Sequence, residues 1–167
     1  AANALHNRVW GSRLFTDTSS FKTVDVPPLV VSSDRWFRPV DVKVGPDGGV
    51  YLADWYDSRL THVDPRDNWH KSSGRIYRLR GKDAKPIPPF DLTNLSNEKL
   101  IELLSHQNKW FRQKAVQVIG ERAGSSIHAV LGQIATSSND PRSLEALWAL
   151  NLSGGFDDVL ANRLLDY

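Results

Sequence analysis

The chain of 167 residues contains no cysteine and no methionine. Without cysteine, these residues cannot form disulfides, thiolate metal sites or the attachment site of a c-type haem. Long hydrophobic runs are also missing, because no stretch approaches the roughly 20 apolar residues of a transmembrane helix. We therefore expect no membrane span in these residues. Methionine is absent even at position 1, and we expect the sequence to be a piece of a longer protein.

Charge of one sign is not in large excess, because 21 Lys and Arg residues face 19 Asp and Glu residues. The formal net charge is only +2, and the basic residues form no long block. We therefore expect no nucleic-acid partner. The apolar fraction of 40% is that of an ordinary globular protein, which excludes wholesale disorder.

The apolar residues follow two different periods along the chain. From residue 36 to residue 79 they alternate as in β-strands, and from residue 95 onward they recur at helical spacing. Residues 81–91 are rich in proline and predict a semi-rigid connection between the two parts. The predicted organisation is a β region at 1–81, a linker at 82–94 and a helical region at 95–167.

Turn residues divide the β region into short strands. Pro27 and Pro28 restrict one of these strands to an edge or an irregular stretch, and residues 45–49 form a tight turn rich in glycine. The order of strand, tight turn, strand, long loop and strand is typical of one β-propeller blade. The predicted strands cover residues 5–15, 21–31, 39–44, 50–56 and 75–80.

Capping residues predict where the helices begin. The predicted N-caps are Ser96, Asn108 and Asp140. Gly124 is expected to end the helix that begins after Asn108. The predicted helix that follows Asn108 and the one that follows Asp140 partly repeat each other, since Ala115 in the first and Ala146 in the second occupy equivalent places 31 positions apart. HEAT units usually span about 40 residues, so the pattern predicts a short HEAT-like repeat, with an irregular helical bundle as the alternative.

One string of residues resembles a known protein family. Residues 36–56 read Trp-Phe-Arg-Pro-Val-Asp-Val-Lys-Val-Gly-Pro-Asp-Gly-Gly-Val-Tyr-Leu-Ala-Asp-Trp-Tyr, and residues 74–78 read Gly-Arg-Ile-Tyr-Arg. This string resembles the closing blade of the planctomycete-type membrane-bound dehydrogenases. In that family, a propeller similar to soluble quinoprotein glucose/sorbosone dehydrogenases leads into HEAT repeats and usually then into a c-type cytochrome domain. The resemblance covers nearly all of residues 1–167.

The resemblance implies a fold and a function for the longer protein. The fold is a partial β-propeller, made of the last blade and part of the preceding one, followed by HEAT-like helical repeats. The function is sugar or alcohol oxidation in the periplasm or cell envelope, with pyrroloquinoline quinone (PQQ) and Ca²⁺ as cofactors. The implied partners are the rest of the propeller and the cytochrome c domain, with a further protein docked on the helices. We expect this piece alone to be inactive. The alternative is a non-catalytic module that binds protein or carbohydrate.

Two loops of the predicted blade are expected at the same end of the sheet, because antiparallel strands place alternate connections together. These loops are residues 32–38 and 57–73. Arg38 enters the first blade strand, where its guanidinium could bind a carboxylate of a cofactor or an acidic sugar. Alternatively, Arg38 forms an ion pair with Asp41 or Asp54. The predicted cofactor-binding residues are Arg38, Asp41 and Arg75.

The remaining candidates lie on the same two loops. Trp36 and Phe37 are predicted to stack on a sugar ring, or alternatively to fill the core between blades. His62 is a further substrate-binding candidate, since imidazole can act as base or ligand. Carboxylate oxygens suit Ca²⁺, although the same residues also suit a hydrogen-bonded turn. The predicted metal ligands are Asp57, Asp64 and Asp67. No residue pattern predicts a catalytic group.

Overall fold

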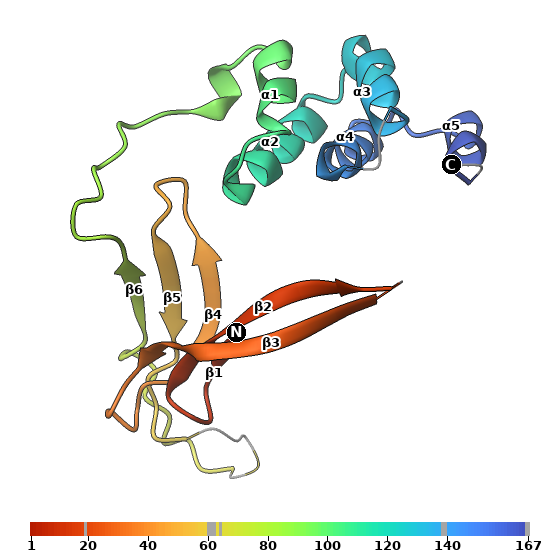
Figure 1. Ribbon diagram of the computed structural model, residues 1–167. Helices are drawn as coiled ribbons and strands as arrows, with labels where there is room; N and C mark the ends of the chain where they lie inside the picture. The colour runs from red at the N-terminus through yellow and green to blue at the C-terminus, as the bar shows by residue number, and fades with distance from the viewer. Residues whose placement is uncertain (19, 60–62, 64, 138–139, 166–167) are drawn as a thin grey trace. The chain divides into compact units, whose positions relative to one another are not determined.

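The computed structural model describes residues 1–18, 20–59, 63, 65–137 and 140–165. The chain forms two compact units, Ala1–Ala84 and Lys85–Tyr167. The first unit contains strands and the second contains helices (Figure 1). The predicted β + α class is therefore confirmed, whereas the propeller and HEAT assignments stay predictions.

The described part of the first unit contains two antiparallel sheets of three strands each, in the orders β1-β2-β3 and β4-β5-β6. The strands are β1 (Ala2–Asn3), β2 (Arg8–Asp17), β3 (Ser20–Val31), β4 (Pro39–Val44), β5 (Val50–Asp54) and β6 (Arg75–Leu79). Each sheet is open, because its outer strands have no further strand partner among the described residues.

The two consecutive prolines lie where the pairing of β2 with β3 is irregular. Val9 pairs with Val30 and Gly11 pairs with Val26, so the register shifts between these pairs. Pro27 and Pro28 fall inside the shifted stretch, and β3 is the outer strand of its sheet. Proline has no backbone N–H to donate, which explains why it is accommodated here, as the sequence predicted.

The turn between β4 and β5 is fixed by glycine and by an ion pair. Gly48 has φ = 73°, a left-handed conformation that favours glycine. The Gly45 N–H donates to the Gly49 carbonyl at 2.8 Å and closes the turn. Arg78 on β6 pairs with Asp47 of this turn, and the hydrogen bond from that guanidinium is the main factor that lowers the pKa of Asp47. The turn is thereby tied to the far strand of its own sheet.

The second unit begins with the 3₁₀ helix η1 (Leu92–Asn94), which lies inside the predicted linker. The elements after it are α1 (Asn97–Leu103), α2 (Lys109–Arg122), the 3₁₀ helix η2 (Ser125–Ile127), α3 (His128–Ala135), α4 (Pro141–Leu152) and α5 (Asp158–Leu165). None of the described helices is long and apolar enough to cross a membrane.

Side chains cap the helices where the sequence predicted them. The Ser96 hydroxyl accepts from Lys99 N–H, the Asn108 side chain accepts from Trp110 N–H, and the Asp140 carboxylate accepts from Ser143 N–H. The end of α2 differs from expectation. Ala123, with φ = 42°, takes the left-handed position that was expected of Gly124.

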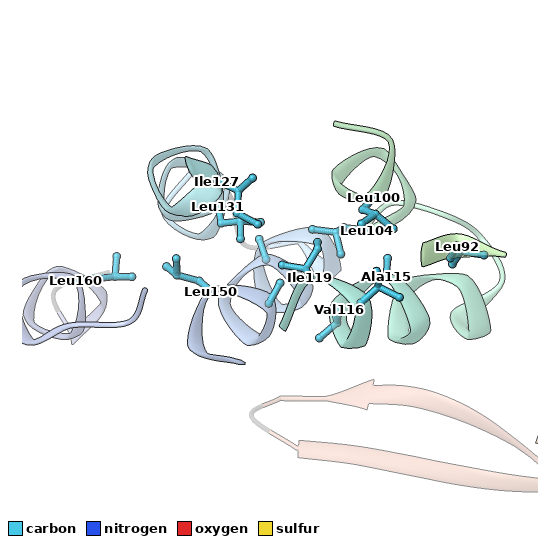
Figure 2. Packing of buried hydrophobic residues seen from close by; sticks show 13 residues of the cluster. Leu92, Leu100, Leu104, Ala115, Val116, Ile119, Ile127, Leu131, Leu150 and Leu160 are labelled. Carbon is cyan, nitrogen blue, oxygen red and sulfur yellow. The ribbon is translucent and has the colours of Figure 1, made fainter. Parts of the chain in front are cut away.

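One cluster of apolar side chains joins the helices (Figure 2). Its 13 buried members are Leu92, Leu100, Leu104, Ala115, Val116, Val118, Ile119, Ile127, Leu131, Ala146, Ala149, Leu150 and Leu160. Ala115 and Ala146 are both fully buried, so the two small side chains allow α2 and α4 to pack closely. In the first unit, many large apolar side chains of the sheets are exposed.

Candidate functional site

Three strand ends of the β4-β5-β6 sheet border one pocket. Arg38 precedes β4, Trp55 follows β5 and Gly74 precedes β6, and all three residues line the pocket. The two loops therefore lie together, as the sequence predicted. The pocket has a volume of about 770 Å³, which is within the range of ligand sites. Its charged and aromatic lining residues are Arg38, Trp55, Asp57, Arg59, Trp69, His70 and Lys71.

Asp57 holds the two ends of the long loop together. Its side chain is fully buried, and its backbone N–H donates to the Trp36 carbonyl at 3.0 Å. Oδ1 accepts from Arg59 N–H at 2.8 Å, and Oδ2 accepts from His70 N–H at 2.8 Å. Burial alone would raise the pKa of Asp57, but these two backbone donors, together with the neighbouring His70 and Trp55 side chains, leave the pKa below its ordinary value. The carboxylate is thus a structural clamp on the pocket wall.

This clamp should respond to acid. Because the pKa of Asp57 is lower in the folded protein than in the unfolded chain, the ionised form adds stability that is complete above the ordinary value of about 3.9. That stability is lost as the pH falls through the lower, folded value. We expect the near-UV circular dichroism of the pocket tryptophans to be constant above pH ~5 and to decline below pH ~4. An Asp57→Asn variant should lack this step, and an unchanged acid transition in that variant would contradict the assignment.

Arg38 is held at the pocket wall by carbonyl groups. Its Nε donates to the Asp57 carbonyl at 3.1 Å and its Nη1 donates to the Ala4 carbonyl at 3.0 Å. In the described part of the chain no carboxylate forms an ion pair with Arg38, although its backbone N–H donates to Asp54 Oδ1 at 2.7 Å. Asp41 lies instead beside Lys43, at 3.4 Å on the exposed surface. The guanidinium is therefore oriented while its charge is not neutralised by a described carboxylate.

Two indole rings form an aromatic wall of the pocket. Trp55 and Trp69 meet edge to face, with ring centroids 5.7 Å apart, and Trp55 remains 51% exposed. The Arg59 guanidinium lies over the Trp69 ring at 4.3 Å and also donates to the Arg66 carbonyl at 2.7 Å. One face of Trp69 is thus covered by the protein, whereas Trp55 retains an accessible surface.

Lys71 brings a third cation to the pocket. Its Nζ lies 2.7 Å from Asp67, and both side chains are largely exposed, at 69% and 68%. Exposed ion pairs of this kind contribute little to stability, so a ligand carboxylate can replace Asp67 at small cost. The pocket lining carries three cationic side chains and one carboxylate, which is already engaged by backbone donors. An anionic ligand is favoured on this account.

Residues 3–83 match the model of a protein family described as a domain of unknown function, DUF7133. The DUF7133 match covers β2 to β6 and Asn3 of β1, and it ends before the first described helix. No curated protein and no solved structure matches the chain.

Within the DUF7133 region, several predicted residues lie beside the pocket or in the core. The Trp36 ring packs against His70, with centroids 4.3 Å apart. Phe37 is buried and its ring contacts Tyr77 at 5.9 Å, which is a core position. Arg75 lies over the Tyr56 ring at 3.8 Å. Of the predicted cofactor and substrate residues that the structure describes, Arg38 alone lines the pocket.

The predicted metal site is only partly described. Asp64 lies outside the described residues, and so does the predicted substrate-binding residue His62. Both oxygens of Asp57 accept backbone hydrogen bonds, and Asp67 pairs with Lys71, so neither presents a free carboxylate. Among the described residues no group of three or more His, Asp or Glu side chains is placed to hold a metal ion. Calcium binding here stays a prediction.

The sequence interpretation did not select Arg59, Trp69 and Lys71. The available signal was the position of Trp55 and Trp69 on either side of the loop that joins β5 to β6. Two tryptophans that flank one loop can meet when the ends of that loop are close together. Here the two backbone hydrogen bonds to the Asp57 carboxylate bring those ends together.

Proposed function

We propose that the chain is the closing part of a β-propeller followed by HEAT-like helices, from a sugar or alcohol dehydrogenase of the quinoprotein type. The observation that carries the proposal is the pocket itself. Arg38, Trp55 and Lys71 come from two connections of one sheet, the one before β4 and the one between β5 and β6, and lie at one end of it. Loops at one end of a propeller commonly form its ligand-binding face.

The exposed apolar surface of the sheets supports a larger β assembly. Leu14 and Phe21 of the first sheet are 64% and 67% exposed, and Ile76 of β6 is 77% exposed. Large apolar patches on a folded unit mark a surface that another element covers. The open outer edges of β3, β4 and β6 are further places where neighbouring strands could pair.

The family resemblance implies PQQ, which would supply the two-electron acceptor. Its flat ring finds no parallel slot between the edge-to-face rings of Trp55 and Trp69, so we assign this pocket to the substrate. Within the described part of the chain, Arg38 and Lys71 form no buried ion pair, so both are available to a carboxylate of the substrate. The described residues give no support for calcium.

The helices are the proposed spacer or docking surface toward an electron acceptor in the cell envelope. α2 and α4 begin after the capping residues Asn108 and Asp140, and the fully buried Ala115 and Ala146 lie at similar places in the two helices. This internal similarity supports a HEAT-like repeat.

A second candidate is a carbohydrate-binding module without turnover. The exposed surface of Trp55 beside Trp69 favours it, because indole rings bind the apolar faces of sugars. This candidate needs the same pocket but neither a quinone nor an electron acceptor.

Dye reduction separates the two candidates. The protein encoded by the complete gene is assayed with a panel of aldoses and alcohols, with and without PQQ and Ca²⁺. We expect dye reduction that depends on the quinone and that falls in a Lys71→Ala variant, while Lys43→Ala, which removes an exposed paired lysine from β4, has no effect. No quinone-dependent reduction across the panel would contradict the dehydrogenase and favour the binding module.

A further inference from the structure

The described pocket combines excess positive charge with an accessible aromatic surface. No carboxylate of the described residues forms an ion pair with Arg38, and two carbonyls orient its guanidinium. Lys71 is exposed and held only by a surface ion pair with Asp67. A neutral sugar would use neither charge, whereas a ligand carboxylate can form charge-assisted hydrogen bonds with both.

The aromatic wall selects the shape of the ligand. Trp55 and Trp69 meet edge to face at 69°, so they do not form the parallel slot that would enclose a flat aromatic ring between them. Trp69 is covered by Arg59 at 4.3 Å, which leaves the half-exposed Trp55 as the stacking surface. One open indole face suits the apolar face of a saturated sugar ring.

We propose that this pocket binds an acidic saccharide, with a uronic acid ring stacked on Trp55 and its carboxylate bound by Arg38 and Lys71. The volume of about 770 Å³ accommodates more than one sugar ring, so an oligosaccharide end fits better than a single monosaccharide. The inference rests on the proposed function in that it takes this pocket as the ligand face, and it names the ligand class of that face.

Calorimetry on the full chain tests the proposal with three probes. Trigalacturonate carries both the ring and the carboxylates, galactotriose carries the rings without the charge, and citrate carries the charge without the rings. We expect trigalacturonate to bind at least about tenfold more tightly than either control, since one charge-assisted contact is worth about a factor of ten. Its affinity should fall several-fold when salt is raised from about 0.05 to about 0.5 M. Equal affinity for galactotriose, equal affinity for citrate, or no binding of trigalacturonate would overturn the proposal.

Matched variants assign the contacts. Trp55→Ala should weaken trigalacturonate about tenfold, and Trp148→Ala, which removes an equally exposed tryptophan (49%) from α4, should not. Lys71→Ala should weaken it about threefold to tenfold and reduce the preference over galactotriose, and Lys43→Ala should do neither. If Trp55→Ala does not fold, Trp55→Phe, which keeps a smaller ring, replaces it with an expected loss of about threefold. Pocket variants that behave like their controls would overturn the site.

The binding measurement separates this inference from the proposed function. A protein that binds trigalacturonate selectively but reduces no dye contradicts the dehydrogenase and leaves the acidic saccharide standing. A protein that oxidises neutral sugars and binds trigalacturonate no better than galactotriose contradicts the acidic saccharide alone.

Discussion

A Glu145→Ala variant should lower the free energy of unfolding of the helical unit by about 3–5 kcal/mol. Glu145 is buried on α4, and its Oε1 accepts from Arg112 Nε of α2 at 3.0 Å. Arg112 also donates to the His106 carbonyl at 2.7 Å, so the same guanidinium connects α2 to the turn before it. Removing the carboxylate leaves a largely buried cation without its partner, which costs far more than an exposed pair is worth. Urea denaturation followed by circular dichroism at 222 nm measures the loss.

Two further variants control this result. Glu102→Ala removes the exposed pair with Lys99 at 2.8 Å and should cost no more than about 0.5 kcal/mol. Replacing both partners together, Arg112→Met with Glu145→Leu, should recover most of the loss, because no buried charge then remains unpaired. Among the described residues, Glu145 Oε2 has no hydrogen-bond partner, so the wild-type pair leaves one buried oxygen unsatisfied, and the double variant removes this cost as well. A single Glu145→Ala variant as stable as the parent chain would show that the pair does not join the two helices.

The second large effect is expected at the pocket, where Asp57→Ala should open the loop between β5 and β6. The substitution leaves two backbone N–H groups, of Arg59 and His70, without their carboxylate acceptor. Each hydrogen bond to a charged group contributes about 1.5–3 kcal/mol, so the local opening energy should fall by about 3 kcal/mol or more. Hydrogen exchange of these two amides should accelerate at least about hundredfold.

Two variants, Asp57→Asn and Asp41→Ala, serve as controls for that prediction. The amide of asparagine keeps one acceptor oxygen, so Asp57→Asn should accelerate only one of the two amides strongly. Asp41 is exposed and paired with Lys43, and its removal should leave the exchange of both amides unchanged. Unchanged exchange in Asp57→Ala would show that other contacts close the loop. Retained binding of trigalacturonate in the same variant would show that the clamp is not needed for the pocket.

Local chemistry made the helical unit predictable. Ser96, Asn108 and Asp140 cap helices because a short side chain can reach an unpaired N–H of the first turn, and this depends only on neighbouring residues. Ala123 was missed for the converse reason. Glycine best tolerates the left-handed conformation, so the sequence predicts the end of the helix at Gly124. In the structure α2 ends one residue earlier, at Ala123.

The pocket was predictable only in outline. The antiparallel order of the strands predicted that Arg38 lies beside the long loop. The hydrogen bond from Arg38 Nε to the Asp57 carbonyl agrees with this prediction. The contacts that complete the site are tertiary, since Trp69 reaches Trp55 only after Asp57 has drawn the loop ends together. The expected partners of Arg38 were carboxylates, yet carbonyl groups orient it, and no residue pattern specifies a backbone acceptor.

The paired prolines of β3 limit how a neighbouring strand can join the first sheet. Pro27 and Pro28 interrupt the row of donors along the outer strand, so an incoming strand would meet two short ladders separated by a gap. Long, continuous β-addition, of the kind that builds fibrils, is thereby disfavoured along this edge. A strand that pairs with this edge would have to be short, or would need an interruption of its own hydrogen bonding opposite the two prolines.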